Sequence, residues 1–173
     1  AEHNPGRGVV WSDVYLDPAG QGWMMSAIAP VYRGDFLEGV VGIDVTVDGI
    51  LSEINGLPVP WDGYAMLISS DMNIMAMPPK AEQDFGLQEL TSHTYQEAIR
   101  REIFKPADFN LAQRTETAGL AEVLQARDQG VEQLKLNDRA LLVGWERVEQ
   151  TGWRLLTVVD EETLFAQTNS LAE

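Results

Sequence analysis

The stretch WSDVYLDPAGQGWMMSAIAPVYRGDFLEGVVGIDVTVDGI, residues 11–50, decides the fold. Apolar, partly alternating runs at 9–17 and 23–32 flank a turn rich in proline and glycine, which is the pattern of a β-hairpin. A tight turn of sequence RGD, residues 33–35, leads into a near-continuous apolar run at 36–45. Together these runs predict three antiparallel strands joined as a meander.

A helix is predicted directly after this meander, because apolar residues recur there at helical spacing. They are Val47, Ile50, Leu51 and Ile54. The next segment, NGLPVPWDG at 55–63, is rich in proline and glycine, which is typical of a linker. We therefore predict a boundary between two units, 1–56 and 57–173.

The sequence of the second unit predicts a short strand pair, then a polar stretch with two helices, and then a second three-strand meander. The expected strands are 64–69, 74–77, 131–136, 139–148 and 153–159, and the expected helices are 91–104 and 118–126. Asp160 then opens a terminal helix, with Glu161 and Glu162 in the first turn, where the helix dipole favours anions.

The two meanders resemble each other, since each runs strand, turn, strand, turn, strand, aspartate, helix. The aspartates are Asp44 and Asp160. Repeated supersecondary units indicate related domains in tandem. The predicted class is α+β, with antiparallel sheets flanked by helices. Only the closing half of the first unit is present, so we expect its opening half to precede Ala1 in a longer protein.

Composition excludes several classes of function. The chain has 12 Lys and Arg against 27 Asp and Glu, a net charge of -15, so nucleic acid is excluded as a partner and anionic membrane surfaces are disfavoured. No run of 18 apolar residues is present that could span a bilayer. The absence of cysteine excludes disulfides, a thiol nucleophile and a finger-type zinc site.

Residues 11–50 resemble the double Cache sensor domains, which are tandem PAS-like extracytoplasmic domains of bacterial histidine kinases, chemoreceptors and cyclases. The resemblance depends on a strand ending Tyr-x-Asp at 15–17, the strand APVY at 29–32, and the strand GVVGID at 39–44. The segments 63–78 and 143–165 resemble the opening and close of the membrane-proximal Cache domain more loosely. The family's transmembrane helices and the opening half of its distal domain have no counterpart here.

The resemblance implies that Tyr15, Asp17 and Asp44 hold a ligand in amino-acid-sensing members, with Trp11 and Tyr32 able to line the pocket wall. A carboxylate pair can bind an ammonium group by charge-assisted hydrogen bonds. Other roles remain open for the same residues. Asp17 precedes Pro18 and can start a turn, Asp44 can cap the following helix, and the two aromatic residues can pack in the core.

Catalytic and metal-binding motifs are absent from the sequence. Neither His3 nor His93 has a carboxylate at metal-ligand spacing, and no acidic stretch has the spacing of a calcium loop. We therefore expect no enzyme active site, no metal and no cofactor in this chain.

The resemblance implies a ligand-sensing domain on the outer side of a bacterial cytoplasmic membrane, in a receptor anchored by transmembrane helices outside this sequence. The expected partner is a small molecule, an amino acid or another amine, with a homodimer as a further expectation. The alternative is a ligand-free structural or dimerisation module that senses through a partner protein.

Overall fold

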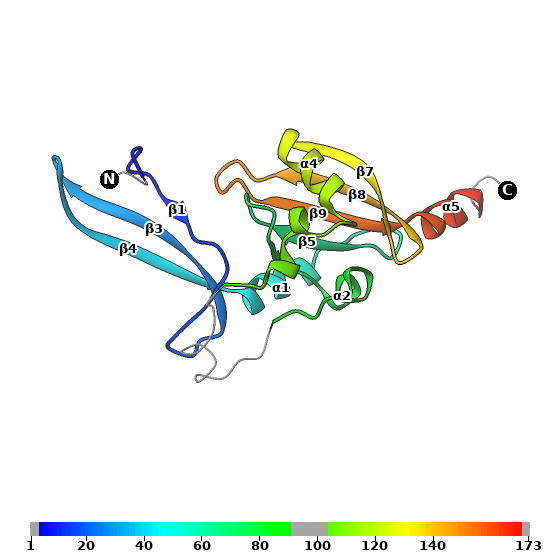
Figure 1. The fold of residues 1–173 in the computed structure, drawn as a ribbon, viewed down its shortest axis with the longest axis horizontal. Helices are drawn as coiled ribbons and strands as arrows, with labels where there is room; N and C mark the ends of the chain where they lie inside the picture. The colour runs from blue at the N-terminus through cyan, green and yellow to red at the C-terminus, as the bar shows by residue number, and fades with distance from the viewer. Residues whose placement is uncertain (1–3, 91–103, 171–173) are drawn as a thin grey trace. The chain divides into compact units, whose positions relative to one another are not determined.

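The computed structural model describes residues 4–90 and 104–170 (Figure 1). Contacts divide the chain into two compact units: unit 1 is Ala1–Gly49 with Leu90–Lys105, and unit 2 is Ile50–Glu89 with Pro106–Glu173. The predicted linker at 55–63 lies a few residues beyond this division, inside unit 2. Of the helix predicted at 91–104, all but Phe104 lies outside the described residues, and Phe104 forms an isolated β-bridge with Tyr15.

Unit 1 contains one antiparallel sheet built on a long hairpin. Strand β3 (Trp23–Arg33) pairs along one edge with β4 (Phe36–Thr46) and along the other with the short strands β1 (Val10–Trp11) and β2 (Tyr15–Leu16). The meander predicted from the sequence is therefore present.

The first strand of that meander is not continuous, as the sequence suggested, but broken between β1 and β2. Ser12 replaces regular pairing with a two-way contact to Ser26: the Ser12 N–H donates to the Ser26 carbonyl, and the Ser12 hydroxyl accepts from the Ser26 N–H. The Ser12 side chain thus takes a backbone donor of β3 that a regular ladder would use.

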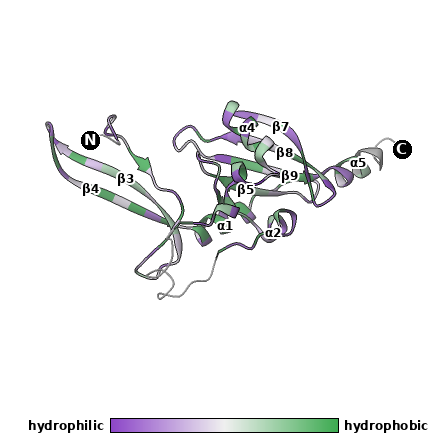
Figure 2. Ribbon diagram, viewed as in Figure 1, coloured by the Kyte–Doolittle hydropathy of each residue, from purple (hydrophilic) through white to green (hydrophobic). Residues whose placement is uncertain are grey.

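Burial differs along this sheet. Leu16, Met24 and Met25 are buried near the start of β3. In contrast, β4 is exposed from Phe36 to Asp44, although Figure 2 shows hydrophobic residues along it.

The helix α1 (Val47–Asn55) follows β4, as predicted. The Thr46 hydroxyl accepts from the Gly49 N–H and so caps its first turn. Val47 and Ile54, which share the predicted apolar face, are buried.

Unit 2 is a five-stranded antiparallel sheet in the order β6-β5-β9-β8-β7. Its strands are β5 (Tyr64–Ile68), β6 (Ile74–Ala76), β7 (Gln129–Leu136), β8 (Arg139–Arg147) and β9 (Arg154–Asp160). The second meander, β7-β8-β9, is confirmed, and β5 pairs with its last strand. The predicted turn at Asn137–Asp138 is also present, with positive φ at both residues.

The helices of unit 2 are α2 (Pro79–Phe85), α4 (Ala118–Ala126) and α5 (Glu161–Ser170), with short 3-10 turns at Ala107–Phe109 and Leu111–Gln113. The sequence reading missed α2, because it took the two prolines at 78–79 only as the end of a strand. Proline is in fact favoured in the first turn of a helix, where its missing N–H costs no bond. Helix α2 ends at Gly86, whose φ of 62° is left-handed.

The core of unit 2 lies on β5, β6, β8 and β9. Fully buried residues there include Met66, Ile68, Ile74, Leu141, Val143, Leu156 and Val158. This packed sheet provides the rigid frame for the polar residues that β5, β8 and β9 contribute to unit 2.

Candidate functional site

Tyr15, Ser26 and Asp44 form a hydrogen-bonded row across three strands of unit 1. Ser26 pairs with Asp44 across β3 and β4, and Tyr15 pairs with Met24 one step along the same face. The Ser26 hydroxyl donates to Asp44 Oδ1 over 2.5 Å, and the Tyr15 and Ser26 hydroxyl oxygens lie 2.7 Å apart. A serine has one O–H, so the Tyr15 hydroxyl donates to Ser26.

This row, which we call the Tyr15–Ser26–Asp44 relay, directs its donors toward one carboxylate. Ser26 is buried, whereas Asp44 is exposed. Among the described residues, Asp44 Oδ2 has no hydrogen-bond partner. The relay therefore leaves Asp44 Oδ2 as an acceptor on the surface. A carboxylate oxygen of this kind can bind a cationic donor such as an ammonium group.

Asp17 has a turn role in the structure. Its carboxylate accepts from the N–H of Ala19 at 3.1 Å and of Gln21 at 3.0 Å, which closes the loop between β2 and β3. Both carboxylate oxygens are thereby used, and neither forms a hydrogen bond with Tyr15, Ser26 or Asp44. The structure thus brings Tyr15 and Asp44 together and leaves Asp17 in the turn.

Trp11 and Tyr32 lie away from the relay. Trp11 pairs with Ala27, which alternates with Ser26, so Trp11 is on the opposite face of the sheet. Tyr32 is on the relay's face but six positions along β3 from Ser26, about 20 Å at the usual rise of a strand. Its ring is covered by the Arg7 guanidinium at 4.3 Å, a cation–π contact.

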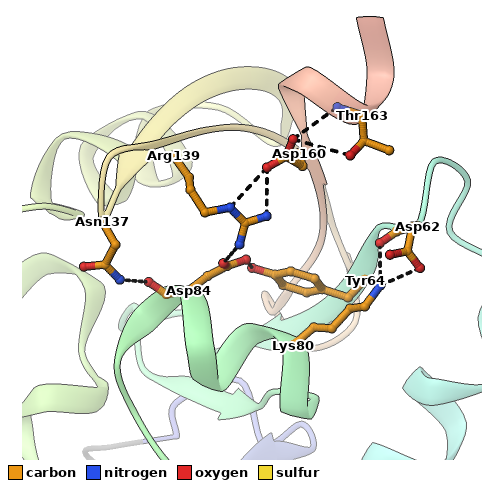
Figure 3. Close-up of polar contacts among 8 residues, drawn as sticks. All are labelled: Asp62, Tyr64, Lys80, Asp84, Asn137, Arg139, Asp160 and Thr163. Atoms are coloured by element: carbon orange, nitrogen blue, oxygen red, sulfur yellow. Dashed lines mark hydrogen bonds and ion pairs between the residues drawn. The ribbon is translucent and has the colours of Figure 1, made fainter. Parts of the chain in front are cut away.

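A second polar cluster, absent from the sequence reading, lies in unit 2 at the start of α5 (Figure 3). Arg139 bridges two carboxylates: it donates to Asp84 of α2 and, at 2.8 and 3.2 Å, to Asp160. The Tyr64 hydroxyl donates to the other oxygen of Asp84 at 2.9 Å. We call these four residues the Arg139 cluster.

Burial, reinforced by the Asp84 charge, raises the pKa of Tyr64 far above its ordinary value, so Tyr64 stays neutral and donates. The hydrogen bond from Arg139 lowers the pKa of Asp160, and the same bond raises the pKa of Arg139. Asp160 also accepts from the Thr163 N–H at 3.1 Å and so caps α5, as predicted. The cluster therefore holds fixed charges at neutral pH.

The Arg139 cluster borders a hollow of about 170 Å³ in unit 2. Trp61, Asp62, Lys80 and Gln83 also line it. No cluster of three or more metal-ligating side chains occurs among residues 4–90 and 104–170, and within the same ranges no helix is long and apolar enough to cross a membrane. Both histidines considered above lie outside these ranges.

Solved structures with a similar fold include extracellular domains of histidine kinases and ligand-binding domains of chemoreceptors. The extracellular domain of the predicted histidine kinase mmHK1S-Z3 matches with a TM-score of 0.68 and 17% identity, over 99% of this chain and 56% of its own. The ligand-binding domain of the Pseudomonas aeruginosa amino acid chemoreceptor PctB, in complex with L-Arg, matches with a TM-score of 0.61 and 19% identity, over 92% and 57%. The ligand-binding domain of Mlp24 with asparagine matches with a TM-score of 0.56 and 19% identity, over 97% of this chain and 57% of its own.

These likenesses confirm the predicted fold class, α+β with antiparallel sheets. The neighbours are sensor domains and not catalytic domains. No protein-family model matches the chain. The chain spans about half the length of the structures it matches.

The sequence reading missed Ser26 and the Arg139 cluster for different reasons. Ser26 is a single small polar residue in an apolar strand, and its contacts with Tyr15 and Asp44 depend on the register of three strands, which no local pattern gives. Arg139 and Asp84 are 55 residues apart in sequence, and no local pattern joins them. The helix signals Pro79 and Gly86 would have revealed α2 but not its partner.

Proposed function

We propose that the chain is part of an extracytoplasmic ligand-sensing domain of a bacterial transmembrane receptor, and that the Tyr15–Ser26–Asp44 relay binds the ammonium group of a small amine. The observation that carries the proposal is the unpartnered, exposed Asp44 oxygen at the end of a donor chain. Similar folds are ligand-binding domains of amino acid receptors, and two of them hold L-Arg and asparagine.

The mechanism that fits this arrangement is a shift of populations. A ligand that binds one conformation of the domain better than another biases the equilibrium toward it, by no more than the difference in affinity. Asp44 lies three residues before α1, so a ligand on its carboxylate acts close to the start of that helix.

The test is a calorimetric titration of the chain with L-arginine, L-glutamine and L-asparagine, each beside its N-acetyl form. The proposal expects that at least one free amino acid binds and that its N-acetyl form, which lacks the ammonium, does not. Asp44→Ala should weaken binding about 10- to 150-fold, the usual loss of a hydrogen bond to a charged group.

The matched control is Asp35→Ala, which removes another exposed carboxylate of unit 1, one paired with Arg7 at the hairpin tip. It should leave the affinity unchanged. Equal affinity of wild type and Asp44→Ala for every amino acid that binds would reject the relay as the binding site.

A second candidate function, a dimerisation module, is favoured by one observation. β4 exposes Phe36, Val41 and Ile43 at 71%, 57% and 66%, on a strand whose outer edge has no partner among the described residues. Exposed apolar surface of this kind is typical of protein contacts. A concentration-dependent dimer that amino acids do not affect, found by sedimentation velocity, would favour this function over the first.

A further inference from the structure

The hollow beside the Arg139 cluster has unused hydrogen-bond donors and no unused buried acceptors. Arg139 carries five N–H groups, of which three are engaged by Asp84 and Asp160, which leaves one on each terminal nitrogen. Lys80 carries three, of which two are engaged by the carbonyl and carboxylate of Asp62, at 2.8 and 2.5 Å.

Two of the three acids in the lining, Asp84 and Asp160, have both carboxylate oxygens engaged, whereas the exposed Asp62 pairs one oxygen with Lys80. Asp84 is 6% exposed and accepts from Tyr64 on one oxygen and from Arg139 on the other. Asp160 accepts from Thr163 on one oxygen and from Arg139 on the other. The three remaining donors of Arg139 and Lys80 require an acceptor, and one ligand carboxylate has enough lone pairs to accept three hydrogen bonds.

The rim of the hollow is held in a strained conformation. Trp61 and Asp62 form the centre of a turn closed by the Gly63 N–H and the Pro60 carbonyl, and their φ angles are 55° and 54°. Left-handed backbone at two consecutive non-glycine residues is costly and persists where the surroundings enforce it. Lys80 holds this turn through both of its bonds to Asp62 (Figure 3). Trp61, in the same turn, is one of the residues that line the hollow.

We propose that this hollow is a second ligand site, for a short-chain carboxylate whose oxygens take the remaining donors of Arg139 and Lys80. Leu141, Val158 and Trp61 supply apolar walls for a short tail, and about 170 Å³ limits the ligand to a few heavy atoms. The site is independent of the Tyr15–Ser26–Asp44 relay, because it lies wholly in unit 2 and needs no amine.

A ligand there would bear directly on the terminal helix. Arg139 already connects β8 to α2 through Asp84 and to the first turn of α5 through Asp160. A carboxylate on the same guanidinium adds a further charge to that junction. The chain's net charge of -15 repels anions at long range, so binding depends on short hydrogen bonds and should be weak.

The experiment is an NMR titration of the whole chain with sodium propionate, with propionamide as the neutral isostere and NaCl keeping ionic strength constant. The Trp61 indole N–H and the Arg139 Nε–H report on the site. Propionate should give saturable shifts with a Kd between about 1 µM and 10 mM. The small number of ligand atoms sets the tight limit, and the detection of saturation by NMR sets the weak limit. Propionamide should give none.

Lys80→Met should weaken propionate binding about tenfold, since it removes one charge-assisted bond and leaves the buried Asp84 paired. Arg33→Met, at an exposed cation of unit 1, is the matched control, and Asp44→Ala separates this site from the relay; neither should change the affinity. Shifts that stay linear to about 50 mM, equal shifts with propionamide, or an unchanged Kd in Lys80→Met would each overturn the proposal.

Discussion

Asp44 and Asp160 occupy the same place in two similar meanders, at the end of the last strand and just before a helix, yet they have different partners. Asp160 caps α5 through Thr163 and pairs with Arg139. Asp44 caps nothing, because Thr46 performs that role for α1, and its only hydrogen bond within the described residues is from Ser26. A repeated sequence position therefore does not carry a repeated role.

The sheets around these aspartates differ in the same way. The residues of β9 alternate between buried and less buried, so one face packs in the core, whereas β4 is exposed from Phe36 to Asp44. Unit 2 uses its meander for stability. The meander of unit 1 is left exposed along β4, where we propose contact with a ligand or another protein. The predictions below test this difference between the units, from the largest expected effect to the smallest.

The largest difference is expected from one type of substitution made in both units. Ile68→Ala, in fully buried β5, should lower the free energy of unfolding of unit 2 by about 2–5 kcal/mol, because it leaves a cavity. Ile43→Ala, at 66% exposure in β4, should cost less than about 0.5 kcal/mol in unit 1. Amide hydrogen exchange, read separately for the two sheets, measures both. Similar losses in the two units would remove the contrast.

The next effect concerns the two aspartates. Asp160→Ala removes a helix cap and a partner of Arg139, so we expect a loss of about 1–2 kcal/mol in urea unfolding. Thr46→Ala should cost about 1 kcal/mol as the true cap of α1, and Asp44→Ala less than about 0.5 kcal/mol. If Asp44→Ala were as costly as Thr46→Ala, Asp44 would have a structural role that its contacts do not show.

Acid should affect unit 2 through Asp160. The hydrogen bond from Arg139 lowers the pKa of Asp160 in the folded state below the value of about 3.9 expected when unfolded. Its contribution is therefore present above about pH 4 and is lost as the pH falls through the lower, folded pKa. Thermal unfolding between about pH 2 and 6 should show a smaller acid-induced drop in Asp160→Asn than in wild type. Asp138→Asn, in the exposed turn between β7 and β8, should behave as wild type.

The smallest effect on stability should come from charge placed on β4. Val41→Lys should change unfolding by less than about 0.5 kcal/mol, because the side chain is 57% exposed. It should nevertheless reduce self-association in sedimentation velocity, since a long apolar edge strand is a template for pairing and lysine blocks it. A dimer that forms equally well in Val41→Lys would show that β4 is not the contact surface.

Much of this fold could be predicted because its signals are local. The apolar spacing at Val47 and Ile54 gave α1, the Asn137–Asp138 turn gave the β7-β8 hairpin, and Asp160 gave the start of α5. The break between β1 and β2 was not predictable from alternation, because it depends on a side-chain bond between Ser12 and the backbone of Ser26.

The sites were harder to predict than the strands. The family resemblance placed Tyr15, Asp17 and Asp44 in one site, and the structure joins Tyr15 to Asp44 through Ser26. No local pattern could show that Asp17 uses both of its oxygens on its own turn. The Arg139 cluster depends on a pairing between residues 84 and 139, which only the closed sheet brings together. Local patterns thus predict elements, and long-range pairing decides which side chains meet.

The position of β5 between β6 and β9 in its sheet has a kinetic consequence. Tyr64 pairs with Val158, although β5 meets its other neighbour, β6, through a short turn. The β5-β6 and β7-β8-β9 segments can each form early from nearby residues, but joining them closes a loop of most of the unit, and such long-range pairing slows folding. During synthesis, the β5-β6 hairpin is formed before β9 has left the ribosome, so the apolar edge of β5 has no partner strand in that interval. An unpaired strand edge favours aggregation, and we expect the protein to be prone to aggregation at this stage.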